Sequence, residues 1–402
     1  MEDQGGVEAR DFGKIGKDCV AFGQIIGQRR QKIRAFPVKR VIIRPVQELT
    51  GVAGHGHSAV FNSTGKPEFD ERIKQLVKDW GHAKNPELIE EMIATALRMS
   101  DDEIGDADLK LFNRSLKELR YSSKVFAPYH GLRKIAIFGS ARTPPEVPEY
   151  QCAVEFSRKM VLHNFMVMTG GGDGIMGAAN EGAGREHSFG LNIRLPFEQR
   201  ANKWIDGDSK LLNFNYFFTR KLVFVKETHA VALFPGGFGT MDEGFECLTL
   251  MQTGKARIIP VVLVNKPGGR YWETWLEFMA KYLLNLGLVS VDDFHLFKIT
   301  DSVDAAVDEI RKFYRNYHSS RWVGHKLVFR LQHRITPAAI EKIENDFVDL
   351  LQGEKIVQGD ALPVEANEPV LAAMPRLILA PHRRNFGRLR LLIDAVNDAE
   401  RP

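Results

Sequence analysis

The chain has 402 residues, of which 44% are hydrophobic and 26% charged, and its formal net charge at pH 7 is +4. These values are typical of a soluble globular protein with two or three domains, and so small a charge argues against nucleic acid as the main partner. No apolar run reaches the roughly 18 residues that a membrane-spanning helix needs, so no membrane partner is expected. The three cysteines, Cys19, Cys152 and Cys247, lie far apart without metal-ligand spacing, which favours a reducing, cytoplasmic environment.

The N-terminal residues 1–65 carry many Gly, Lys and Arg residues and little periodic pattern, which predicts a flexible extension. His55 and His57 lie in a Gly- and Ser-containing stretch of this segment. Such a pair can bind a metal ion, but it is more often part of an ordinary loop, and we expect no metal site.

Residues 66–125 are predicted to form a helical segment. Asn85 followed by Pro86 is a good helix start, and apolar residues recur after it at helical spacing. A further helix is expected from near Asp106. Nothing in this segment suggests catalysis.

Residues 126–317 alternate between apolar strand-like runs and helical patterns. Strands are expected at 134–138, 165–168, 189–195, 230–234 and 258–264, with a sixth at 294–300. This alternation predicts an α/β fold with a doubly wound parallel (Rossmann-like) sheet, which binds its ligands at the carboxyl ends of the strands.

The alternation resumes on a smaller scale over residues 318–402, which are predicted to form a small α/β appendage. Strands are expected at 326–331 and 376–380, and helices at 337–351 and 385–396. The last helix is basic, and its arginines are interpreted either as a site for an anionic effector or, more commonly for such patterns, as a solvated helix face. These arginines are Arg383, Arg384, Arg388 and Arg390.

Three of the expected strands end in glycine-bearing turns. The turns contain Gly139 and Ser140, then Gly171 and Gly172, and then residues 236–239. Because the carboxyl ends of parallel strands share one edge of a sheet, these turns should converge on one crevice.

The second of these turns also matches a dinucleotide-binding pattern. Gly172, Gly174 and Gly177 have the GxGxxG spacing, which raises the possibility of a nicotinamide cofactor. However, the turn follows the second strand of the unit, and the next strand ends without an acid placed to hold a ribose diol. A phosphate or sugar site is therefore favoured over an NAD site, and a purely structural turn is the alternative.

The third turn lies in the stretch ALFPGGFGTMDEGFE, residues 232–246, where a strand, a glycine turn and a helix N-terminus follow one another. Glycines let a ligand come close to the backbone, and free N–H groups at a helix start attract an anion. Asp242 and Glu243 are expected in the first turn of this helix, where the helix dipole favours the ionised carboxylate. A carboxylate beside a phosphate site predicts a catalytic role.

Arg220 and Lys221 follow an aromatic run, residues 213–219, that is expected to be helical. Charged residues beside aromatics are often only the rim of an apolar surface. Here, however, Arg220 lies on the helix that enters the strand at 230–234 and Glu243 on the helix that leaves it, so both can face the crevice.

The stretch TRKLVFVKETHAVALFPGGFGTMDE resembles the RK…PGGxGTxxE pattern of the LOG family, the cytokinin riboside 5′-monophosphate phosphoribohydrolases, long mislabelled as lysine decarboxylases. The stretches MTGGGDGIMGAANEGA and LNIRLPFEQ are similar to those of longer bacterial members. The resemblance covers about residues 130–317.

The resemblance implies a catalytic pair, which falls here on Arg220 and Glu243. It also implies contacts to the nucleotide from the lysine after the arginine, from the glycine turn, from a threonine six residues after the glutamate and from an acid in the preceding loop. Together with the two other turns, the expected substrate-binding residues are Gly139, Ser140, Gly171, Gly172, Glu198, Lys221, Gly236, Gly237, Phe238, Gly239, Thr240 and Thr249.

The implied reaction is hydrolysis of the N-glycosidic bond of a nucleoside 5′-monophosphate, AMP or an N6-substituted AMP, to free base and ribose 5-phosphate. It needs no metal or other cofactor. Its transition state resembles an oxocarbenium ion, which a fixed carboxylate such as Glu243 stabilises, while Arg220 holds phosphate or ribose oxygens. Family members pair as dimers, so a homodimer or higher homo-oligomer is expected, with the aromatic run 214–218 and the helix at 243–253 as contacts.

Three other functions remain as alternatives. The first is a nucleotide-binding sensor or carrier without efficient turnover, since related folds carry molybdenum cofactor. The second is the old decarboxylase label, which would require pyridoxal phosphate, and the third is a dehydrogenase.

Overall fold

The computed structural model describes residues 63–195, 200–351, 353–365 and 368–402. The chain divides into two compact units, Met1–Arg114 and Ser115–Pro402. The predictions for the N-terminal extension, for His55 and His57 and for Glu198 concern residues outside the described ranges.

The described part of the first unit is helical, as predicted. It contains α3 (Pro67–Trp80), α4 (Pro86–Asp101) and the start of α5 (Asp106–Phe126). Pro86 occupies the first turn of α4, where its missing N–H costs nothing, and Asn85 precedes it. Ile73 and Val77 of α3 pack with Ala94 of α4 in a small core.

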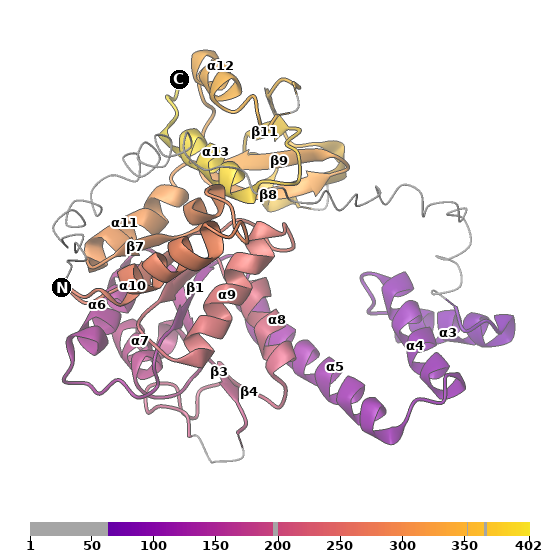
Figure 1. Cartoon of the computed structure of the whole chain (residues 1–402). Helices are drawn as coiled ribbons and strands as arrows, with labels where there is room; N and C mark the ends of the chain where they lie inside the picture. Colours follow the sequence, from indigo (N-terminus) through magenta and orange to yellow (C-terminus); the bar gives the residue numbers. More distant parts are fainter. Residues whose placement is uncertain (1–62, 196–199, 352, 366–367) are drawn as a thin grey trace, which may run out of the picture. The chain divides into compact units, whose positions relative to one another are not determined.

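The second unit contains a parallel sheet of seven strands in the order β4-β3-β2-β1-β5-β6-β7, which confirms the predicted fold class (Figure 1). The strands are β1 (Arg133–Phe138), β2 (Phe165–Thr169), β3 (Ser188–Ile193), β4 (Leu211–Phe214), β5 (Ala230–Leu233), β6 (Val261–Val264) and β7 (Lys298–Thr300). From β1 the chain moves outward to β4 and then returns to place β5 on the other side of β1. The order therefore reverses between β1 and β5, which is where doubly wound sheets bind ligands.

Helices cover both faces of this sheet. Two separate apolar clusters lie on opposite faces of the sheet, and each packs three helices against its face. The first face carries α6 (Pro148–Leu162), α7 (Ile175–Ala183) and α11 (Val303–Phe313), and the second carries α8 (Phe217–Glu227), α9 (Phe238–Gln252) and α10 (Tyr271–Phe278). Strands that are buried on both faces consist of continuous apolar runs, so the sequence pattern predicted most of them.

Three details of the sheet differ from the prediction. The edge strand β4 was not expected, because its four residues run into the aromatic stretch that was interpreted as helix; the helix begins only at Phe217. Strand β6 begins at Val261 rather than at residue 258. Most of the expected strand at 294–300 is a short 3-10 helix, Asp292–Leu296, and only Lys298–Thr300 forms a strand.

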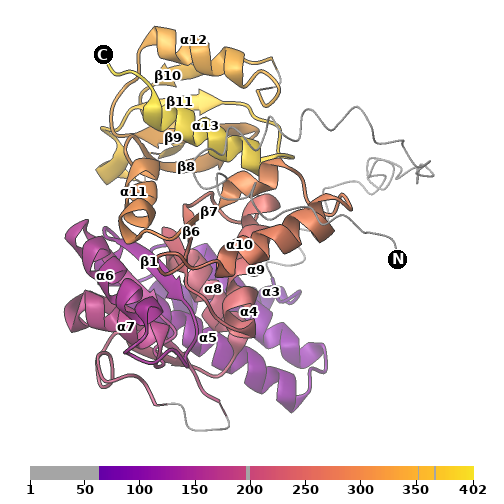
Figure 2. The same cartoon turned by 60° about the vertical axis from the view of Figure 1, so that its left-hand side comes forward.

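The C-terminal part of the second unit is a separate antiparallel sheet of four strands in the order β10-β11-β9-β8. Its elements are β8 (Tyr317–Val323), β9 (Lys326–Leu331), α12 (Pro337–Asp346), β10 (Val357–Gly359), β11 (Arg376–Leu379) and α13 (Phe386–Asp398). Figure 2 shows α13 lying against this sheet and next to α11 of the parallel-sheet layer. A Cβ on Gly387 of α13 would lie 1.9 Å from the Asp292 carbonyl oxygen, so the two parts of the unit are closely packed.

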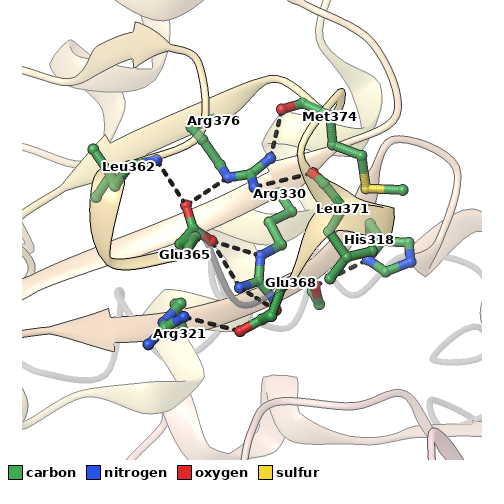
Figure 3. A network of polar contacts seen from close by, with 10 residues as sticks. His318, Arg321, Arg330, Leu362, Glu365, Glu368, Leu371, Met374 and Arg376 are labelled. Carbon is green, nitrogen blue, oxygen red and sulfur yellow. Dashed lines mark hydrogen bonds and ion pairs between the residues drawn. The ribbon is translucent and has the colours of Figure 1, made fainter. Parts of the chain in front are cut away.

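A buried ion network ties the loop before β11 to the small sheet (Figure 3). Glu365 is 2% exposed and accepts hydrogen bonds from Arg330 Nε (2.9 Å) and Nη2 (2.7 Å) on one oxygen and from Arg376 Nε (2.9 Å) on the other. Glu368 pairs with Arg330 (2.7 Å) and with Arg321 (2.9 Å). Opposite charges therefore satisfy one another in the interior of this small domain.

Two arginines of the basic last helix, Arg388 and Arg390, form ion pairs, whereas Arg383 and Arg384 are exposed and precede the helix. Arg390 is 4% exposed and pairs with Glu309 of α11 at 2.5 Å, and Arg388 pairs with Asp349 at 3.0 Å. Arg383 stacks on the Trp322 ring at 4.0 Å. Of the four arginines, Arg390 is thus part of the contact between the two sheets of this unit, because its partner lies on α11.

Within the described ranges, no helix is both long enough and apolar enough to cross a membrane.

Candidate active site

The three glycine turns meet at the switch point of the sheet, as predicted. Ser140, at the end of β1, donates its N–H to the Pro235 carbonyl oxygen at 3.1 Å and accepts from Ile175 N at 3.0 Å. A Cβ on Gly236 would lie 2.9 Å from Ser140 N, and one on Gly174 would lie 2.3 Å from the Ser140 oxygen. The turns after β1, β2 and β5 are therefore interlocked around Ser140.

This interlocking changes the role of two expected glycines. Gly139 and Gly236 were expected to let a ligand approach the backbone. A Cβ on Gly139 would lie 2.6 Å from the Ile175 side chain, and one on Gly236 would lie 2.1 Å from Thr240 Oγ1. Packing of the turns against one another therefore already requires glycine at both positions.

The turn after β2 is held by a buried amide that sequence reasoning missed. Asn202 donates from Nδ2 to the carbonyl oxygens of Gly171 (3.1 Å) and Gly172 (2.9 Å). The same Nδ2 donates to Asn180 Oδ1 (2.9 Å), which also accepts from the Thr169 hydroxyl (2.9 Å). No periodic pattern marks Asn202, since its importance comes from partners about 20 to 30 residues earlier in the chain.

The turn after β5 leads into α9, which begins at Phe238 with Gly237 as its N-cap residue and without a side-chain cap. No neighbouring atom lies within 4 Å of a Cβ built on Gly237 or Gly239, and the Phe238 side chain is 96% exposed. Within the part of the chain that the structure describes, the N–H groups of these three residues have no hydrogen-bond acceptor. They form an open row of donors at a helix N-terminus, which is the usual setting for a bound phosphate.

Arg220 reaches this place from α8. Its Nη2 donates to Glu243 Oε1 at 2.8 Å, and its Nη1 lies 3.9 Å from where a Cβ on Gly170 would be. The guanidinium also packs over the rings of Phe217 (5.2 Å) and Phe224 (5.8 Å), and its buried Nε has no partner in the described residues. The cation thus connects the turn after β2 with the carboxylate of α9.

A carboxylate from α5 sets the start of α8. Glu118 accepts from Asn215 N (2.8 Å), from Asn215 Nδ2 (2.7 Å) and from the Thr219 hydroxyl (2.5 Å). Because Thr219 directly precedes Arg220, this contact holds the first turn of the helix that carries both cations. The sequence offered no signal for it, since Glu118 and Thr219 are 101 residues apart.

Lys221 makes three contacts to carboxylates of α9. Its Nζ lies 2.8 Å from Asp242 Oδ2, 2.9 Å from Glu246 Oε2 and 3.8 Å from Glu243 Oε2. Burial alone would lower the pKa of Lys221, but the hydrogen bonds to Asp242 and Glu246 raise it above its ordinary value.

Glu243 is 7% exposed, and its environment differs from the expectation. Since α9 begins at Phe238, Glu243 lies in the second helical turn, beyond the strongest effect of the helix dipole. Burial raises the pKa of this carboxyl, although Arg220 and Lys221 oppose the rise. The prediction that Glu243 lies in the first turn, where the helix dipole favours the ionised carboxylate, is therefore wrong, and the pKa of this carboxyl is above its ordinary value.

The two expected threonines of α9 differ in their surroundings. Thr240 is buried at the start of α9, beside Gly236. Thr249 is exposed on α9, and its carbonyl oxygen accepts from Thr253. The structure therefore brings together Ser140, the glycine turns, Arg220, Lys221 and Glu243, but it does not connect Thr249 with them.

Comparisons with known proteins agree with the resemblance seen in the sequence. Residues 176–310 match a family model described as "Possible lysine decarboxylase". Cytokinin riboside 5′-monophosphate phosphoribohydrolase LOG2 of Arabidopsis thaliana is 27% identical over 154 residues, which are 37% of this chain and 69% of that protein. LOG1 of the same plant is 25% identical over 184 residues, 45% of this chain and 84% of that protein.

Solved structures give weaker likenesses. The molybdenum cofactor binding protein of Rippkaea orientalis is 19% identical, with a TM-score of 0.33, over 45% of this chain and 96% of that one. The molybdenum cofactor carrier protein of Chlamydomonas reinhardtii is 19% identical, with a TM-score of 0.32, over 45% of this chain and 97% of that one. Likenesses of this size say nothing about what the chain does.

The parallel-sheet domain is thus an α/β domain with a charged site at its switch point. Its resemblance to the LOG family is confirmed, at low sequence identity, by the family model and by the plant relatives.

Proposed function

We propose that this protein is a nucleotide phosphoribohydrolase, which hydrolyses the N-glycosidic bond of a nucleoside 5′-monophosphate. The observation that supports this most directly is the buried Arg220–Glu243 ion pair beside the open N–H groups of residues 237–239. The plant relatives named for this activity support the substrate class.

The 5′-phosphate would bind the N–H groups at the start of α9, because an anion there is stabilised by unpaired donors and by the helix dipole. This would place the ribose toward the interior of the crevice, where Glu243 lies. The planar guanidinium of Arg220 can hold ribose or phosphate oxygens while it keeps the Glu243 carboxylate in place.

Glu243 would act on the anomeric carbon. Breakage of the C1′–N bond leaves positive charge on the ribose, which a fixed carboxylate stabilises. A raised pKa makes the Glu243 carboxylate a stronger base than an exposed glutamate, so it is suited to take a proton from the attacking water. The hydroxyl of that water joins C1′, and the departing base ends with the proton.

The test is release of free base and ribose 5-phosphate by the full chain from a panel of nucleoside 5′-monophosphates that includes AMP and N6-substituted AMP. Glu243→Gln should lower kcat by about 100-fold or more while nucleotide binding survives. The control is Glu277→Gln, which changes an exposed glutamate of α10 that pairs with Arg270 at 2.9 Å. Bound nucleotide that stays intact over prolonged incubation would reject the hydrolase and favour the carrier function instead.

We further propose that two copies of the chain pair through α8 and the start of α9. Phe217, Phe218 and Leu222 are about half exposed on α8, and Phe238 is almost fully exposed. An apolar surface of this kind beside a site is typical of a protein–protein contact. Light scattering on the purified chain measures the oligomeric state, and Leu222→Glu should shift it toward the monomer.

A further inference from the structure

The ammonium group of Lys221 is surrounded by carboxylates. Its Nζ lies at hydrogen-bond distance from Asp242 (2.8 Å) and Glu246 (2.9 Å), and 3.8 Å from Glu243. The side chain is 16% exposed, so little of it can meet solvent or a ligand. A phosphate at this lysine would have to compete with these carboxylates.

The charge around Lys221 also disfavours phosphate. Arg220 and Lys221 are the two cations of the cluster, and Asp242, Glu243 and Glu246 are its three carboxylates. With all five groups ionised, the cluster has one net negative charge. A phosphate dianion would be repelled there, whereas the N–H groups of residues 237–239 present no such charge.

The geometry instead links Lys221 to the orientation of Glu243. Arg220 contacts Oε1 of Glu243 at 2.8 Å, and Lys221 lies 3.8 Å from Oε2, so each carboxylate oxygen faces a different cation of α8. Asp242 and Glu246 are one helical turn apart on α9, on either side of Glu243, and both hold the ammonium group. The lysine is therefore kept beside Glu243 by Asp242 and Glu246, while Arg220 pairs with Glu243 itself.

We propose that Lys221 and Glu246 are positioning residues: Glu246 holds Lys221 beside Glu243, and Lys221 orients that carboxylate without contacting the substrate's phosphate. This inference rests on the proposed function for its kinetic consequences and departs from the expected role of Lys221 as a nucleotide contact. The net negative charge of the cluster then stabilises the positive charge that develops on the ribose in the transition state.

The two residues should act on Glu243 in opposite directions. Lys221 lowers the pKa of Glu243, and Glu246 raises it, while burial and Arg220 are the other main influences. Asp242 is the remaining charged group of α9 in the cluster, and it is largely exposed. Loss of Lys221 should therefore raise the pKa of Glu243. Glu246→Gln keeps an oxygen that accepts from Lys221 but removes the negative charge, so it should lower the pKa of Glu243.

The experiment compares Lys221→Met and Glu246→Gln in the full chain, with Lys221→Arg as the conservative variant. The acid limb of the kcat profile should move up by about one pH unit in Lys221→Met and down in Glu246→Gln, and Lys221→Arg should stay near the native protein. The control is Lys226→Met, which removes an exposed lysine of α8 that pairs with Glu227. Thermal denaturation shows whether each variant is folded.

Binding of inorganic phosphate, measured by calorimetry, separates the two roles of Lys221. Lys221→Met should change the phosphate affinity by less than about twofold, since no contact is lost; a loss of tenfold or more would overturn the proposal. Shifts of both acid limbs in the same direction would also overturn it. If the native protein hydrolyses no nucleotide, the proposed function fails, and NMR titration of the Glu243 carboxyl still tests the opposite shifts in the same variants.

Discussion

Replacement of Glu365 by glutamine should strongly destabilise the small C-terminal sheet. Glu365 is buried between Arg330 and Arg376, and both arginines are themselves buried. Glutamine has a similar shape but no charge, so the buried guanidinium of Arg376 loses its carboxylate partner, and that of Arg330 is left with Glu368. Breaking a buried ion pair by removal of one partner typically costs roughly 3–5 kcal/mol.

The pKa of Glu365 gives an independent magnitude. Although burial raises this pKa, the hydrogen bonds from Arg376, Leu362 and Arg330 lower it from 4.5 to about 2. A shift of this size corresponds to about 3 kcal/mol of stability. Because the folded-state pKa is the lower one, this stability is present above about pH 4.5 and is lost as the pH falls toward about 2.

Urea denaturation of the native chain and of Glu365→Gln, followed by Trp fluorescence and circular dichroism, measures the difference. We expect about 3 kcal/mol at pH 7, and we expect the difference to shrink below pH 4.5, where the native carboxylate also loses its charge. The control is Asp360→Asn, which removes an exposed pair with Arg334 (2.6 Å) and should cost less than about 1 kcal/mol. The reasoning is refuted if Glu365→Gln costs no more than this control, or if its effect does not depend on pH.

Two further predictions concern the turn after β5. Tyr271 of α10 donates its hydroxyl to the Gly236 carbonyl oxygen at 2.5 Å. In a trans peptide the carbonyl oxygen and the next N–H point in opposite directions, so this bond fixes the direction of the Gly237 N–H. Tyr271→Phe should therefore raise the KM for nucleoside monophosphates about fivefold without lowering the melting temperature. Steady-state kinetics and calorimetry measure the two quantities, and an unchanged KM would contradict this role. Gly236→Ala should destabilise the fold by roughly 1–3 kcal/mol in urea denaturation, because its Cβ would lie 2.9 Å from Ser140 N, whereas Gly237→Ala has open space and should leave stability nearly unchanged.

The apolar pattern of the sequence was sufficient to predict the parallel sheet and the convergence of the glycine turns. Strands buried on both faces, such as β1, β2 and β5, are continuous apolar runs, and each is followed directly by its turn. The positions of Arg220 and Glu243 on the helices before and after β5 followed from the same alternation. These are local properties, since strand, turn and helix are encoded by neighbouring residues.

The tertiary structure decided what the local pattern does not contain. Strand β4 has only four residues, too few for a clear alternation, and its pairing with β3 makes it a strand. Asn202 holds the turn after β2 and Glu118 holds the start of α8, each through partners that are far away in the chain.

The direction of the pKa shift of Glu243 was decided in the same way. It depends on how deeply α9 is buried and on which residues of α8 face it, and neither is a property of residues 232–246 alone. The sequence by itself therefore determined which chemical groups lie near the switch point. The packing of α8 against α9 determined that three carboxylates surround Lys221 and that the Glu243 carboxyl has a raised pKa. Contact partners and desolvation arise only when distant segments fold together.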